Sequence, residues 1–171
     1  MSGALVVKST GPSVTLQDMG RPGNMAFGLS CGGAADRYAL VEGAVLLGQD
    51  ITCAAIEMAG FGGVFEATQN TRIALTGAPM QVDLDGQTLA WNASHSVLAG
   101  QKLAIGGVKE GAFGYLHVAG GFQTPPFLGS RSGHLMAGIG AAVQRGDVLP
   151  IATDPKPDTA SVKLPKPNRF N

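Results

Sequence analysis

Residues 14–36 hold the side chains of this chain that are best suited to chemistry. They combine an acid and a base, Asp18 and Arg21, with Pro22 and a high density of glycines. Residues 14–17 alternate apolar and polar side chains, as a half-buried strand does. Pro22 has no N–H and the glycines permit positive φ, so the chain must leave the strand here. We therefore predict Asp18 and Arg21 at a strand end, where they either face a common ligand or form an ion-paired structural turn.

A second polar segment, Gly-Ser-Arg-Ser-Gly, occupies residues 129–133. Its backbone amides, the hydroxyls of Ser130 and Ser132 and the guanidinium of Arg131 suit a carboxylate or a phosphate. A surface turn with a solvated Arg131 is the alternative interpretation. Gly120 and Gly121 offer amides for an oxyanion, or else form a β-bulge. Thr-Gly-Ala-Pro at residues 76–79 ends a predicted strand in the same manner.

The sequence lacks the signatures of common metal and nucleotide sites. It has no P-loop pattern, and the glycine-rich residues 138–143 fail the dinucleotide fingerprint. His95, His117 and His134 stand apart, with no His or Cys at ligand spacing, so no metal is predicted. His117 lies in an apolar run, which favours a hydrogen-bonded histidine of a sheet over a ligand.

Composition narrows the choice of partners. Twelve Lys and Arg balance twelve Asp and Glu, which leaves no basic surface for nucleic acid. Charged residues make up 14% of the chain, against about 25% in typical domains. That deficit favours a surface partly covered by another protein or domain. No apolar run is long enough for a membrane span, and two cysteines without a signal peptide favour a cytoplasmic protein.

The elements that position these residues are mostly strands. One short helix is predicted near residues 37–47, with Asp36 as its N-cap and Gly48 as its C-cap. Asp85-Gly86 is typical of a type I′ hairpin, with Leu89 and Trp91 in the return strand. Many short strands with frequent turns predict a mainly β barrel or sandwich. The other predicted strands cover residues 5–7, 14–17, 54–58, 64–67, 71–76, 80–84, 103–105, 113–119 and 148–151.

The last residues differ from the rest. From residue 153 onward four prolines stand among charged residues, Ser and Thr, which predicts an exposed linker or tail over 153–171. Residues 1–152 are then a single folded unit. A linker implies that another segment follows residue 171.

Five motifs, taken in order, resemble one family. It is the biotin-dependent carboxyltransferase family that includes KipA, allophanate hydrolase subunit 2, the C subunit of bacterial 5-oxoprolinase and a domain of urea carboxylase. Gly-Asp-x-Leu-Pro at residues 146–150 matches the segment that closes the first half of the family's domain. The resemblance spans about residues 5–151. Its motifs are Thr-Leu-Gln-Asp-x-Gly-Arg-x-Gly (15–23), Ala-Ile-Glu (55–57), Ala-Leu-Thr-Gly-Ala (74–78), Tyr-Leu-His-Val-Ala-Gly-Gly (115–121) and Gly-Ser-Arg-Ser (129–132).

The resemblance implies an N-terminal subdomain with cyclophilin-like barrel character that works beside a KipI-like subunit. It implies amide or urea-type substrates, of the 5-oxoproline, allophanate or urea class, and ATP or biotin on a separate carrier as cofactor. The enzyme would be a hydrolase of the ATP-dependent 5-oxoprolinase type or a carboxyltransferase. By this analogy Asp18, Arg21 and Arg131 are catalytic. The substrate-binding residues would be Thr76, Gly120, Gly121 and Ser130.

The chain also departs from the family. A usual Pro-x-Ser-Gly-Ala-Met-Asp segment is Ser-Cys-Gly-Gly-Ala-Ala-Asp at residues 30–36, Ala44 replaces an Asn, and Ala141 replaces an Arg. The family's second half is missing from the 171 residues. A non-catalytic module that associates with a KipI-like protein is therefore the alternative function. A glycine-rich β domain without a site of its own is the third.

Overall fold

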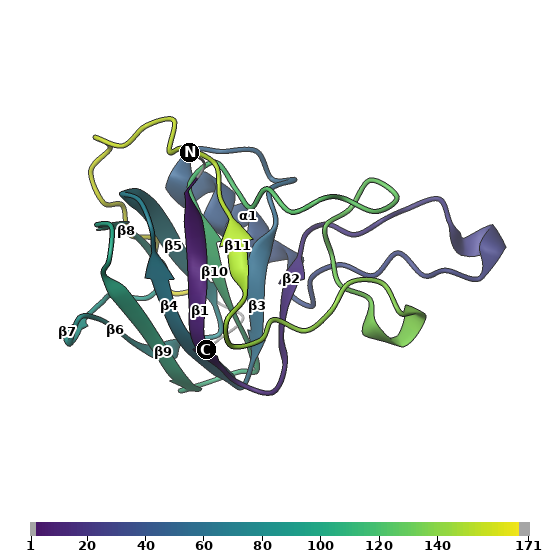
Figure 1. Ribbon diagram of the computed structural model, residues 1–171, viewed down its shortest axis with the longest axis horizontal. Helices are drawn as coiled ribbons and strands as arrows, with labels where there is room; N and C mark the ends of the chain where they lie inside the picture. Colours follow the sequence, from purple (N-terminus) through teal and green to yellow (C-terminus); the bar gives the residue numbers. More distant parts are fainter. Residues whose placement is uncertain (1–2, 168–171) are drawn as a thin grey trace.

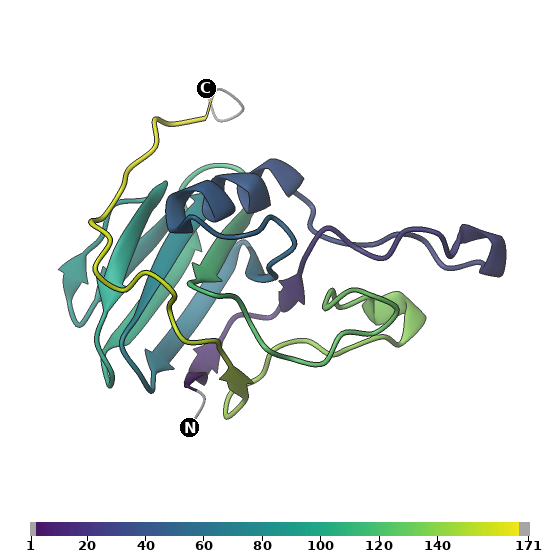
Figure 2. The ribbon, with the colours of Figure 1, turned by 90° about the horizontal axis from the view of Figure 1, so that it is seen from above.

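Two antiparallel sheets pack face to face, and a helix lies on the outside of one of them (Figures 1 and 2). The computed structural model describes residues 3–167. The six-stranded sheet has the spatial order β11 (Val148–Pro150), β1 (Ala4–Thr10), β4 (Phe61–Ala67), β9 (Lys102–Val108), β6 (Met80–Leu84) and β7 (Gln87–Thr88). The five-stranded sheet has the order β2 (Val14–Gln17), β3 (Ala55–Ala59), β10 (Phe113–Val118), β5 (Thr71–Gly77) and β8 (Ala93–Val97). The prediction of a mainly β fold is confirmed.

The five-stranded sheet is buried on both faces. On β5, Ile73 and Leu75 point into the core between the sheets, while Ala74 and Thr76 point toward the helix. All seven residues of β5 are buried for this reason, because side chains alternate between the faces of a strand. The core between the sheets is apolar and includes Leu5, Phe65, Leu103, Ile56 and Leu116.

Most predicted strands are confirmed, with two differences. Asp85 and Gly86 both have positive φ, 48° and 84°, as a type I′ hairpin requires. The return strand β7 ends at Thr88, however, so placing Leu89 and Trp91 in it was wrong. Trp91 instead donates from Nε1 to the Gly77 carbonyl, 3.1 Å away. Strand β8 was not predicted, because its sequence Ala-Ser-His-Ser-Val has few apolar residues.

The predicted helix is confirmed as α1 (Arg37–Leu47) with both of its caps. The Asp36 side chain accepts a hydrogen bond from the Ala39 amide, and Gly48 ends the helix with φ 65°. Leu40 and Leu47 are buried against the sheet, and each contributes about 1.5–3 kcal/mol by leaving water. Within residues 3–167, no helix has the length and apolar character that crossing a membrane requires.

Gly43 packs α1 tightly against the sheet. A Cβ at this position would lie 2.2 Å from Cε1 of the buried His117, whose ring is held by Thr76. Alanine favours a helix over glycine by about 1 kcal/mol. We nevertheless expect Gly43→Ala to destabilise the fold by about 2 kcal/mol, because overpacking outweighs propensity. Urea unfolding measures the change; the exposed Val45→Ala should alter stability by less than about 0.5 kcal/mol. A stabilised Gly43→Ala protein would contradict this packing.

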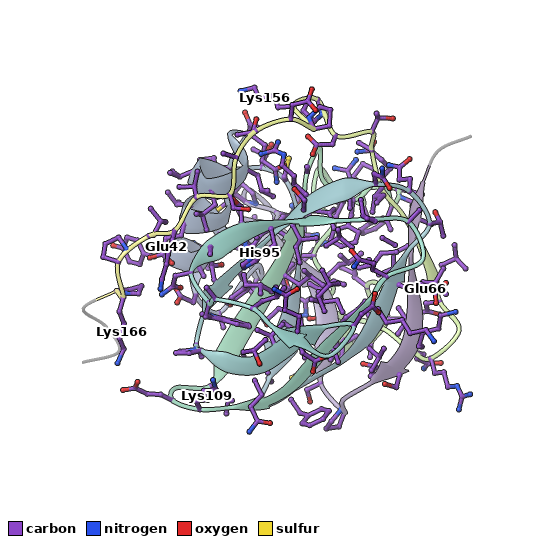
Figure 3. The ribbon with its side chains drawn as sticks, turned by 90° about the vertical axis from the view of Figure 1, so that its left-hand side faces the viewer. Glu42, Glu66, His95, Lys109, Lys156 and Lys166 are labelled. Atoms are coloured by element: carbon purple, nitrogen blue, oxygen red, sulfur yellow. The ribbon has the colours of Figure 1, made fainter. Side chains whose placement is uncertain are left out.

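The C-terminal segment is attached to the domain. Residues 155–163 are exposed, as expected, but Asp154 is not. Asp154 is buried and forms an ion pair with Arg72 of β5. Farther on, Lys163 forms an isolated antiparallel β-bridge with Ala93, and the Leu164 amide donates to the Asn92 carbonyl. Figure 3 views the end of the sandwich opposite the long loops, with the tail passing beside α1. The boundary at residue 152 stays a prediction.

Two long loops project from one end of the sandwich (Figures 1 and 2). One runs from β2 to α1 and carries the short 3-10 helix η1 (Met25–Phe27); the other runs from β10 to β11 and carries η2 (Leu135–Ala137). They are joined near their bases, where the Gly133 amide donates to the Leu16 carbonyl. The chemistry-bearing residues 18–21 and 129–132 lie in these loops.

Candidate active site between the two long loops

The Asp18 carboxylate joins the two loops. One oxygen, Oδ1, accepts from the hydroxyls of Ser130 and Ser132, both at 2.6 Å, and from the Gly20 amide at 2.8 Å. The other, Oδ2, accepts from the Arg131 amide at 2.6 Å. Burial disfavours the charged carboxylate, but these four donors outweigh burial and lower the pKa of Asp18. Asp18 is therefore ionised at neutral pH, and its oxygens are already occupied.

Arg21 also binds the second loop, and the ion pair suggested for Asp18 and Arg21 is not formed. The Arg21 side chain is 1% exposed. Its Nη2 donates to the Ser132 carbonyl, and its Nε donates to the Phe127 carbonyl at 3.3 Å. Both residues thus lie at the strand end, as predicted. Each holds the 127–132 segment in place instead of pairing with the other.

Arg131 is held between two cavities, which rules out the alternative of a solvated surface turn. Its Nε donates to the Thr124 carbonyl at 2.7 Å, and the side chain is half-buried. The first cavity, of about 330 Å³, is lined by Asp18, Met19, Gly20, Thr52, Gly129 and Arg131. The second, of about 220 Å³, is mostly apolar and is lined by Arg131 with Leu16, Thr124, Pro125, Gly133, residues 140–143, Asp147 and Leu149. Among the described residues, Arg131 is the one cation in either lining, so it is the group placed to bind an anionic or polarised oxygen.

Three predicted substrate-binding residues lie elsewhere. Thr76 is fully buried beneath α1, where its Oγ1 donates to the Ala39 carbonyl at 2.8 Å and contacts His117 Nε2 at 2.8 Å. The Gly120 amide donates to Gln49 Oε1, and the Gly121 amide donates to the Val118 carbonyl. None of the three lines a cavity beside Arg131. Neither glycine amide is free to bind an oxyanion.

His117 is the hydrogen-bonded sheet histidine that its sequence context suggested. Burial lowers its pKa to about 3, so the ring is neutral and serves packing. Within residues 3–167, no three His, Cys, Asp or Glu side chains are grouped to hold a metal ion. Metal independence stays a prediction.

Ser132 supplies the second hydroxyl of the predicted cradle but was not counted among the substrate-binding residues. It gives Asp18 a hydroxyl hydrogen bond and accepts one at Oγ from the Asp18 amide, 2.8 Å away. The signal was its spacing: in an extended segment, residues 130 and 132 point the same way, so both hydroxyls reach one carboxylate. Cys53 lies near Gly121 and lines neither cavity; burial, with the charge of Asp50, raises the pKa of its thiol.

Sequence comparison relates this architecture to named proteins. Residues 27–171 match the model of a family described as carboxyltransferase domain, subdomain A and B. The C subunit of 5-oxoprolinase from Haemophilus influenzae is 39% identical over 144 residues, covering 82% of this chain and 47% of that protein. Its Escherichia coli counterpart is 36% identical over 151 residues, covering 86% of this chain and 49% of that protein. Urea amidolyase of Lachancea kluyveri is 31% identical over 169 residues, covering 96% of this chain and 9% of that protein.

Solved structures show the same fold. TTHA0988 superposes with a TM-score of 0.91 at 29% identity, over 97% of this chain and 34% of that chain. The K. lactis urea amidolyase superposes with a TM-score of 0.84 at 29% identity. The match covers 96% of this chain and 10% of that one. The chain spans about half the length of the two 5-oxoprolinase subunits it matches. The resemblance read from its motifs is confirmed: this chain belongs to the family of carboxyltransferase domains with subdomains A and B.

Proposed function

We propose that this chain is the N-terminal part of a KipA-like carboxyltransferase or amidohydrolase subunit. Its substrates would be small amides or urea-type molecules, as the names of the relatives suggest. The observation that carries the proposal is the half-buried Arg131 guanidinium between two cavities, at the end of the network centred on Asp18.

Arg131 would act on the oxygen that gains charge. When an amide or carboxylated carrier reacts, negative charge develops on the carbonyl oxygen, and a fixed guanidinium stabilises it more in the transition state than in the ground state. Asp18 would be a positioning residue, because its oxygens are occupied by four donors. Ser130 would position the loop in the same way. The amides of Gly120 and Gly121 are engaged within the chain and have no part in this step.

The two cofactors implied by the resemblance differ in how they fit. Biotin is largely apolar, and the second cavity offers a mostly apolar lining that includes Arg131, so Arg131 would hold the carboxylate on the ring nitrogen of a carrier-bound carboxybiotin. That group would supply the carboxyl for transfer. ATP fits poorly, because Arg131 is one cation for three phosphates and the chain has no P-loop pattern. We assign ATP use to a KipI-like partner subunit.

The second half of the family's domain would cover the tips of the long loops. Four large apolar side chains are exposed there: Met25 (78%), Phe27 (87%), Leu135 (53%) and Met136 (97%). Apolar side chains gathered in this way mark interaction surfaces. The family model includes two subdomains, and the relatives are about twice as long as the matched region. We propose that this second subdomain docks on the tips and that the enzyme is completed by a KipI-like protein.

The test is Arg131→Ala in the native protein, assayed with its KipI-like subunit for carboxyl transfer and for ATP-dependent opening of 5-oxoproline. We expect kcat/KM to fall by about 10²–10³-fold, the usual effect of removing one transition-state donor. Binding to the partner should be unchanged. Arg145→Ala removes an equal charge from an exposed position and should leave turnover intact.

A non-catalytic binding module is the second candidate, favoured by the occupied oxygens of Asp18 and the exposed loop tips. Unchanged turnover in Arg131→Ala would refute the catalytic assignment. If Met136→Asp then abolished association, the binding module would be the better description.

A further inference from the structure

The first cavity beside Arg131 is lined in part by a residue that belongs to neither long loop. This residue is Thr52, in the loop 48–54 that joins α1 to β3. The same loop lies close to the charge of Arg131. Burial raises the pKa of the adjoining Cys53 thiol most, the charge of Asp50 raises it further, and the charge of Arg131 opposes both. Asp50 and Arg131 are therefore near enough to act on one thiol.

The hydroxyl of Thr52 has a fixed direction. Its Oγ1 donates to Asp50 Oδ1 at 2.6 Å, and the Thr52 amide donates to the same oxygen at 2.8 Å. These two hydrogen bonds lower the pKa of Asp50, so its carboxylate is ionised at neutral pH. An ionised carboxylate only accepts hydrogen bonds, so the hydroxyl proton is committed to Asp50. The lone pairs of Oγ1 remain, and Thr52 offers the cavity an acceptor.

Arg131 offers the same cavity donors that are still accessible. Its Nε is committed to the Thr124 carbonyl. Nη1 and Nη2 make no hydrogen bond with any of residues 3–167, and neither of these two nitrogens is buried. A guanidinium has donors only. The cavity of about 330 Å³ therefore combines a charged donor, Arg131, with a neutral acceptor, Thr52.

The charges around this cavity disfavour an anion as its occupant. The pKa values of Asp18 and Asp50 are both lowered, so both carboxylates are ionised at neutral pH, and Arg131 is the one cation among the described lining residues. A ligand carboxylate would meet like charges at short range, whereas a neutral amide would not. An amide also presents a carbonyl acceptor and an N–H donor, which match Arg131 and Thr52.

We propose that Thr52 is a specificity-determining residue, and that the first cavity binds the amide end of the substrate. The carbonyl oxygen would accept from Arg131, and an N–H would donate to Oγ1 of Thr52. Asp50 is then a positioning residue, because it orients the hydroxyl. This inference rests on the proposed function and deepens it, since it assigns the first cavity to the amide and leaves the second to the carrier. A site that binds an N–H discriminates against analogues without one.

The experiment is an NMR titration of the native protein with acetamide and, separately, with N,N-dimethylacetamide, which keeps the carbonyl but has no N–H. We expect acetamide to give saturable shifts of the backbone signals of Gly20 and Gly129, which line the cavity. Thr52→Val keeps the shape and removes the acceptor. It should weaken acetamide binding by about tenfold, as loss of one hydrogen bond does, and leave dimethylacetamide binding unchanged. Acetate should bind more weakly than acetamide.

Two further variants separate the hydroxyl from general effects. Thr52→Ser keeps the acceptor and should bind acetamide as the wild type does. Thr88→Val makes the same chemical change as Thr52→Val at an exposed position of β7, and it should leave the dissociation constants unchanged.

The proposal is overturned if acetamide gives no saturable shifts, if Thr52→Val binds acetamide as tightly as Thr88→Val, or if it loses both amides equally. Tighter binding of acetate than of acetamide would also overturn it. None of these readouts depends on turnover. Retained turnover in Arg131→Ala would refute the catalytic assignment, whereas the Thr52→Val titration tests the amide subsite alone.

Discussion

Asp18→Asn should cost about 3–5 kcal/mol of unfolding free energy at pH 7, because each hydrogen bond to a charged group contributes about 1.5–3 kcal/mol. The carboxylate accepts four hydrogen bonds, two of them from serine hydroxyls. An amide has the same shape but presents an NH2 group to donors, so at least one donor is left buried and unpaired. Urea unfolding of the wild type and the variant measures the difference.

The same substitution should remove part of the acid sensitivity. Because the pKa of Asp18 is lowered in the folded state, its contribution is complete above the unfolded pKa of about 3.9 and is lost as the pH falls through the folded pKa. Stability should therefore decline less steeply below about pH 4 in Asp18→Asn than in the wild type. Asp83→Asn, at an exposed hairpin, is the matched control. Equal stability of both variants at pH 7 would show that Asp18 does not hold the loops together.

The second large effect is expected from Asp154→Ala. Its carboxylate binds Arg72 in a two-point arrangement, with Nε–Oδ2 at 2.8 Å and Nη2–Oδ1 at 2.9 Å. Both side chains are almost fully buried, and Arg72 Nη1 already lacks a partner among residues 3–167. Removing one member of a buried ion pair leaves an uncompensated charge, so we expect a loss of about 3–5 kcal/mol. Thermal and urea unfolding at neutral pH measure it.

The double variant Arg72→Met/Asp154→Leu separates charge from packing. It removes both charges together, and it should lose less stability than Asp154→Ala alone. Lys166→Ala breaks the exposed pair with Glu110, where both side chains are 48% exposed, and should cost less than about 1 kcal/mol. If Asp154→Ala also lowered the unfolding free energy by less than about 1 kcal/mol, the buried pair would not anchor the C-terminal segment.

The elements with strong local signals were predictable from the sequence. The Asp36 side chain and the Gly48 backbone cap α1 through hydrogen bonds within a few residues, so its bounds follow from the sequence alone. Strand β2 is likewise predictable, because apolar and polar side chains alternate along it. Strand β8 carries no such signal, because its stability comes from pairing with β5 and from the tail that covers it.

The candidate site was predictable in its members but not in their partners. Asp18, Arg21 and Arg131 do lie together, yet Asp18 binds serines 112 and 114 residues away instead of Arg21. Thr76 resembled a site residue because it ends a strand, but α1 covers it. The Arg72–Asp154 pair joins residues 82 positions apart, and no local pattern indicates such a contact.

The position of β1 has a consequence for the order in which the chain folds. This first strand lies between β4 and β11, with Ala4 opposite Pro150. During synthesis it therefore lacks one neighbour until nearly the whole domain has left the ribosome. Contacts of such long sequence separation slow folding, with times of milliseconds to seconds typical of β sandwiches. The six-stranded sheet should close late, and the exposed edge of β1 is the part of the nascent chain most in need of protection from aggregation.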